Sequence, residues 1–123
     1  MIRIIGILCL WLLALSGPAL AGTCVVPYIP TLDNQTVVGT MYAVSGKRCS
    51  IVSLRSPGPV HSAHLVARPS NGSVSINGGS VVYVSRPGFV GEDRFSYARK
   101  GLNALNQPVT RTVDVNVKVS ARL

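Results

Sequence analysis

Short apolar runs alternate with turn residues along most of the chain, and the clearest run lies near the C-terminus. Over residues 111–119, four valines alternate with polar residues, so all four face one side of an extended strand. Residues 73–76 and 81–84 lie on either side of Asn77-Gly78-Gly79-Ser80, which predicts a β-hairpin with a Gly-rich turn. The other predicted strands are 37–44, 49–55, 62–68 and 94–98.

The spacing of the turn residues predicts the fold class. Gly, Pro, Asn and Asp recur about every 8–12 positions, which is typical of sandwiches and barrels. About seven short strands in roughly 100 residues indicate an all-β fold, an immunoglobulin-like β-sandwich. The sequence has no sustained helical period, and only residues 103–106 suggest a short helical turn. Residues 22–36 are expected to form a loosely packed lead-in to the domain.

The first residues have the order of a secretory signal peptide. Arg3 precedes an almost unbroken apolar run over 4–15, a breaker follows at 16–18, and Ala19-Leu20-Ala21 matches a cleavage site. A membrane anchor is less favoured, because about 20 apolar residues are needed to span a bilayer. We therefore expect a signal peptide over 1–21 and one mature immunoglobulin-like domain over 22–123, located in the periplasm or secreted.

The cysteines agree with export. Cys9 lies in the predicted signal peptide, which leaves Cys24 and Cys49 in the mature domain. A pair of cysteines in a small exported domain predicts a disulfide bond. A metal or redox pair is the alternative, and it is less favoured because such cysteines are usually close in sequence.

The segment 68–119 carries a recognisable pattern. It reads P-x-x-G-x-V, a strand with Tyr83, then P-G-F-x-G-x-D-x-F-x-Y over 87–97, and finally the alternating valines. This pattern resembles the bacterial immunoglobulin-like and cadherin-like repeat domains of exported proteins, and it covers about half of the mature chain. The resemblance implies a non-catalytic module in which Phe89, Phe95 and Tyr97 fill the core and Asp93 caps the turn of the motif.

Some relatives of this kind bind calcium between tandem repeats, but this chain departs from them. It contains a single copy and only four acidic residues, of which Asp114 lies on a separate predicted strand. Calcium takes about six to eight oxygen ligands, largely carboxylates. We therefore expect no cofactor.

No arrangement of residues predicts a metal site or catalysis. His61 and His64 are the only histidines, and on a strand their spacing places them on opposite faces. A zinc site needs at least three protein ligands, so a periplasmic metal carrier is only a minor alternative. The sequence has no G-x-S-x-G motif, phosphate loop or dinucleotide fingerprint, and we expect no enzyme.

The basic charge is the one indication of a partner. The chain has 12 basic and 4 acidic residues. Arg86, Arg94, Arg99 and Lys100 fall within one stretch, and on a shared face they would attract polyanions. These four residues are the candidate anion-binding site, together with the loop over 103–108. Nucleic acid is not expected as a partner, because the aromatic residues of the motif are assigned to the core.

The sequence predicts an exported non-catalytic binding module, and anionic components of the cell envelope such as glycan or lipid are its expected ligands. The alternative is a structural or accessory subunit of an envelope or adhesive protein assembly, which would pair through an exposed strand edge. No transmembrane segment is expected after signal cleavage.

Overall fold

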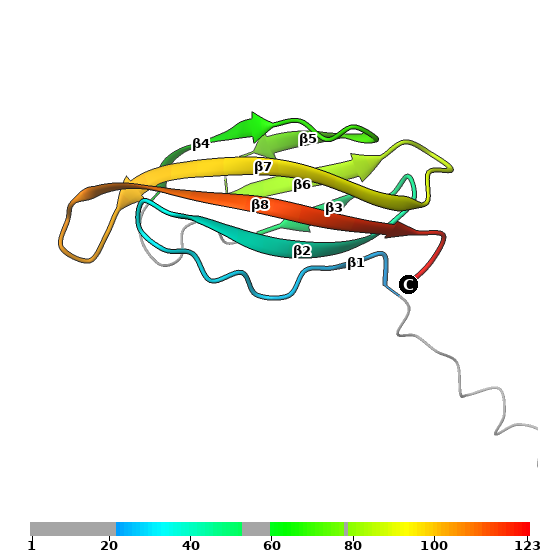
Figure 1. The fold of residues 1–123 in the computed structure, drawn as a ribbon, viewed down its shortest axis with the longest axis horizontal. Helices are drawn as coiled ribbons and strands as arrows, with labels where there is room; N and C mark the ends of the chain where they lie inside the picture. The colour runs from blue at the N-terminus through cyan, green and yellow to red at the C-terminus, as the bar shows by residue number, and fades with distance from the viewer. Residues whose placement is uncertain (1–21, 53–59, 78) are drawn as a thin grey trace, which may run out of the picture.

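The described part of the chain is built from strands and turns without helices, as the turn spacing predicts. The computed structural model describes residues 22–52, 60–77 and 79–123, so the predicted signal peptide, 1–21, lies outside the described residues. The described part contains eight strands and no helix (Figure 1). They are β1 (Cys24–Val25), β2 (Thr36–Val44), β3 (Cys49–Ile51), β4 (Val60–Ala67), β5 (Gly72–Asn77), β6 (Ser80–Ser85), β7 (Gly91–Leu102) and β8 (Pro108–Ser120).

The strands form two sheets. The larger sheet has the order β1-β2-β8-β7-β4, and the smaller has the order β3-β6-β5. Strands β2 and β8 are parallel, and every other pair is antiparallel. The predicted hairpin is confirmed, since Asn77 of β5 pairs with Ser80 of β6. The strands run along the long axis of the molecule (Figure 1).

The alternating valines of β8 form the centre of the core. Val113, Val115 and Val117 are fully buried, while the polar residues between them face outward from the larger sheet. The core also contains Met41 of β2, and Val81, Tyr83, Phe95 and Tyr97 from β6 and β7. Residues of both sheets therefore share one core, which alternation along each strand makes possible.

Several elements differ from the prediction. Most strands are longer than expected, because their hydrogen-bonded ladders continue beyond the predicted bounds. The exception is β3, predicted over 49–55, which ends at Ile51. Residues 53–59 lie outside the described residues. Residues 103–106 form a turn with a hydrogen bond from Asn106 N–H to Asn103 O, and they are not helical. The lead-in contains β1 and packs Val26 and Ile29 against the core, so it is more ordered than expected.

One buried carboxylate joins three parts of the fold. Asp93 is 8% exposed and accepts four hydrogen bonds. Its Oδ1 accepts from the backbone N–H of Ser70 and Arg94, both at 2.9 Å. Its Oδ2 accepts from Asn71 N–H at 3.0 Å and from the Tyr83 hydroxyl at 2.8 Å. The sequence places this cap on the turn of the motif itself, which is wrong: Asp93 caps the β4–β5 turn through Ser70 and Asn71, and it also reaches β6 through Tyr83.

We expect Asp93→Asn to destabilise the domain by about 3 kcal/mol. The amide nitrogen that replaces one carboxylate oxygen would face two hydrogen-bond donors and could accept from neither. Asp114→Asn is the matched control. Asp114 lies on the outer face of the larger sheet, accepts from the Ser96 hydroxyl at 2.6 Å and approaches Arg94 at 3.8 Å. Urea unfolding followed by circular dichroism should show a loss for Asp93→Asn that clearly exceeds the control. Equal losses would contradict the role assigned to Asp93.

The Tyr83 hydroxyl should make the domain sensitive to alkaline pH. Burial raises the pKa of Tyr83 above its usual value, and the hydrogen bond to Asp93 raises this pKa further. In the unfolded chain the tyrosine ionises at a pKa of about 10, so the free energy of unfolding should fall as pH rises above that value. Tyr83→Phe should have a shallower fall, measured by urea unfolding between neutral and alkaline pH. Parallel curves for the two proteins would count against this assignment.

Candidate functional site

The structure does not bring the four predicted anion-binding residues to one place. Arg94 and Lys100 lie on the outward face of β7, six residues apart, which is roughly 20 Å along a strand. Arg99 points to the opposite side of β7 and is 5% exposed. Arg86 follows β6 in the turn that leads to β7. Their joint role in anion binding stays a prediction.

Three chain segments that are distant in sequence meet at one end of the molecule. The N–H of Ser45, in the β2–β3 turn, donates to Ser120 O at the end of β8 at 2.9 Å. The next residue, Gly46, donates its N–H to Ser85 Oγ at 2.9 Å, directly before the β6–β7 turn. Figure 1 shows both turns at the end where the C-terminus lies. The C-terminal tail, the β2–β3 turn and the β6–β7 turn are therefore neighbours.

These three segments carry exposed cations. We call this set the basic end: Lys47 and Arg48 of the β2–β3 turn, Arg86 of the β6–β7 turn, and Arg122 of the tail, all exposed. The nearest acidic residues have other contacts, since Glu92 approaches Lys118 Nζ at 3.7 Å and Asp93 is buried. Sequence reasoning identified Arg86 and missed the rest, because the turns meet only after the sheets form.

The position of Arg86 is fixed by its neighbours. Its backbone N–H donates to Asn71 O at 2.8 Å, and its Nη2 donates to Asn71 Oδ1 at 2.7 Å. Its guanidinium also lies over the Phe89 ring, 5.6 Å from the ring centroid. A guanidinium placed in this way remains exposed. When it binds an anion, it loses less conformational entropy than an arginine side chain that no neighbour holds.

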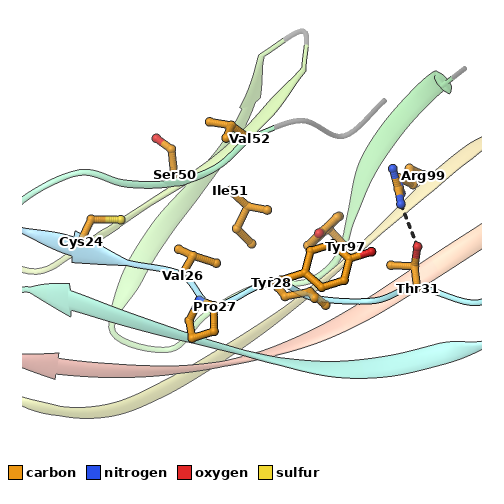
Figure 2. A pocket seen from close by; sticks show the side chains of 11 residues that line it. Cys24, Val26, Pro27, Tyr28, Thr31, Ser50, Ile51, Val52, Tyr97 and Arg99 are labelled. Atoms are coloured by element: carbon orange, nitrogen blue, oxygen red, sulfur yellow. Dashed lines mark hydrogen bonds between the residues drawn. The ribbon is translucent and has the colours of Figure 1, made fainter. Parts of the chain in front are cut away.

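A pocket of about 550 Å³ lies between the lead-in and β3. Figure 2 shows the lead-in along one side, the residues from Ser50 to Val52 along the other, and β7 behind them. Most of the lining side chains are apolar. They are Val26, Pro27, Tyr28 and Ile29 of the lead-in, Ile51 and Val52 beside it, and Tyr97 of β7. The polar groups of the lining are the side chains of Thr31, Ser50 and Arg99 and the hydroxyls of Tyr28 and Tyr97, and Ser50 lies toward the Cys24 end (Figure 2).

Arg99 and Thr31 lie together at one end of this pocket (Figure 2). The Nη2 of Arg99 donates to Thr31 Oγ1 at 2.8 Å. Burial lowers the pKa of Arg99, and the charge of Arg111 lowers it too. Arg111 is the residue opposite Arg99 on β8; it is buried and pairs with Asp33 Oδ1 at 2.7 Å. The guanidinium of Arg99 stays charged at neutral pH, because arginine in proteins does not lose its proton.

The predicted disulfide is confirmed. Cys24 and Cys49 are bonded, with their Cα atoms 5.1 Å apart. The bond connects the beginning of the lead-in to β3, at the end of the pocket opposite Arg99 (Figure 2). The wall that the lead-in forms is thus held at both ends, by the disulfide at one and by the Thr31 and Asp33 contacts at the other.

The other candidates do not gather into a site. His64 is exposed on β4, and the side chain of His61 lies outside the described part of the structure. Among the described residues, no group of three or more His, Cys, Asp or Glu side chains is close enough to hold a metal ion. In the loop over 103–108, Asn103 Oδ1 accepts from the backbone N–H of Leu105 and Gln107, so this side chain is used to shape the turn.

No protein-family model matches the sequence, and a search of curated proteins finds no match. Within the described ranges, no helix has the length and apolar character needed to cross a membrane.

We expect removal of the disulfide to destabilise the domain and to loosen the lead-in. The bonded cysteines are 25 residues apart in sequence, and a loop of this size contributes roughly 3–4 kcal/mol in the chain-entropy description. The double variant Cys24→Ser/Cys49→Ser should lose about this much in urea unfolding. Limited proteolysis under native conditions should cut it first between Val25 and Asn34. Cleavage elsewhere first would show that the disulfide does not hold this segment.

Proposed function

We propose that this protein is an exported, non-catalytic binding module of the immunoglobulin-like class that binds anionic components of the cell envelope through the basic end. It would be made with a cleaved signal peptide, 1–21, and act in the periplasm or outside the cell. The Cys24–Cys49 disulfide supports this location, because disulfides persist in oxidising compartments.

The order of the strands supports the immunoglobulin-like assignment. In such domains the first, second, fifth and fourth strands form one sheet and the third, sixth and seventh form the other. Here β3-β6-β5 corresponds to the second, fifth and fourth strands, and β4-β7-β8 to the third, sixth and seventh. The first long strand, β2, departs from this pattern, because it lies parallel to β8 and extends the larger sheet. The proposed resemblance to bacterial repeat domains is compatible with this order.

The observation that carries the binding proposal is the meeting of three segments that bear exposed cations. Lys47, Arg48, Arg86 and Arg122 come from distant positions, yet the hydrogen bonds of Ser45 and Gly46 hold their segments side by side. Exposed Lys and Arg attract anionic surfaces and contribute about 1 kcal/mol each near one. Arginine also binds phosphate and carboxylate groups through two parallel hydrogen bonds.

The proposal is tested with charge reversals that change the net charge equally at two places. The first variant is Lys47→Glu/Arg48→Glu/Arg86→Glu, and the control is Arg68→Glu/Arg94→Glu/Lys100→Glu, which reverses exposed cations elsewhere. Binding to vesicles containing phosphatidylglycerol and to lipopolysaccharide is measured at low and physiological salt. We expect the first variant to bind at least about tenfold more weakly, and wild-type binding to fall steeply with salt.

A control variant that loses as much affinity as the first would contradict the basic end as the binding surface. Binding that salt does not weaken would contradict an electrostatic mechanism altogether. Capture of a protein partner from the envelope that survives high salt would favour the alternative, a subunit of a protein assembly.

A further inference from the structure

We propose that the pocket between the lead-in and β3 binds a small free carboxylic acid with an apolar chain, whose carboxylate meets Arg99 and Thr31. This site is separate from the basic end and does not depend on the function proposed for it. Arg99 lies eight residues along β7 from Gly91, roughly 26 Å from the end of the strand that is next to the basic end.

The two ends of the pocket differ in chemistry. At one end is the buried guanidinium of Arg99 with the Thr31 hydroxyl, and the remaining wall is formed mainly by apolar side chains such as Val26, Ile29 and Ile51. Figure 2 shows the polar pair at one end and the apolar side chains spread along the rest. An amphipathic ligand with a single charged group fits this division. The volume of about 550 Å³ lies within the range of small-molecule sites, roughly 300–1,000 Å³.

The charge at the polar end selects an anion. Arg99 and Arg111 face each other on β7 and β8, and like charges at directly opposite positions are unfavourable. Asp33 offsets the charge of Arg111. Because burial and Arg111 both lower the pKa of Arg99, a negative charge brought next to Arg99 would stabilise this group.

The hydrogen-bonding groups select a carboxylate. A guanidinium binds a planar carboxylate through parallel N–H donors. Thr31 Oγ1 accepts from Arg99, so the proton of the hydroxyl is available to donate to a ligand oxygen. One cation among neutral hydroxyls matches a monoanion better than the greater charge of a phosphate monoester.

Two apolar side chains at the pocket would be covered by such a ligand. Tyr28 and Val52 both line the pocket and are 85% and 64% exposed. Covering exposed apolar surface is favourable by about 25 cal/mol per Å². The chain of the acid would therefore lie between these residues and the core.

The test compares ligands that differ only in the head group. Octanoate, octanol and octylammonium are titrated into the oxidised protein by calorimetry, with backbone amide NMR to locate the site. We expect saturable binding of octanoate that shifts the signals of residues around Thr31 and Val52, and much weaker binding of the alcohol and the amine. Equal affinity for octanol, or no saturable binding of octanoate, would overturn the proposal.

Variants then separate the pocket from the rest of the surface. Thr31→Val and Arg99→Met should each weaken octanoate binding, by at least about tenfold for Arg99→Met. If Arg99→Met does not fold, Val52→Glu replaces it. A negative charge beside the pocket should repel the acid and weaken octanoate binding about tenfold. Val38→Glu is the matched control, because Val38 is 63% exposed on β2 and does not line the pocket.

The basic-end variant Lys47→Glu/Arg48→Glu/Arg86→Glu should bind octanoate as the wild type does, so failure of one proposal is distinguishable from failure of the other. Unchanged octanoate binding in Val52→Glu would overturn the placement of the ligand. A short hydrophobic peptide with a free C-terminal carboxylate is titrated in parallel, and tighter binding of the peptide than of octanoate would overturn the assignment to a free acid.

Discussion

The buried carboxylate of Asp93 is the contact on which the C-terminal end of the domain depends. A charge this far from water is tolerated only when donors surround it, and here four are supplied by Ser70, Asn71, Tyr83 and Arg94. Asn71 then holds Arg86 through two further hydrogen bonds. An interior anion thus determines where an exterior cation is presented. The stability of the fold and the position of a proposed binding residue are two results of one network.

The pocket depends on a different constraint, which is the path of the lead-in. This segment follows the side of the molecule, and Ile29 packs so closely on Gly39 that a β-carbon there would lie 2.5 Å from Ile29 Cδ1. The segment is attached at the Cys24–Cys49 bond and again near Thr31 and Asp33. Between these attachments a space remains beside β3. The cavity therefore results from fixing a non-strand segment at its two ends.

The sequence predicts elements governed by local alternation better than features that arise from tertiary structure. The valines of β8 were assigned correctly to one face because a period of two is a property of the strand itself. The same period separates Arg99 from Arg94 and Lys100, so part of the predicted anion site was already divided between two faces. By contrast, the basic end requires knowing which turns meet. The burial of Arg99 and Arg111 is not predicted, although both continue the inward-facing alternation of their strands, because arginines are usually exposed.

The disulfide has a mechanical consequence for a chain under tension. Cys24 and Cys49 are 25 residues apart in sequence but their Cα atoms are 5.1 Å apart. A force that pulls on the chain from outside these residues passes directly through the sulfur atoms and not along the backbone between them. The lead-in and β2 are therefore withheld from stretching, which shortens the fully extended chain by about 80 Å. A pull on the two ends of the domain would leave this segment unstretched while the remaining strands resist.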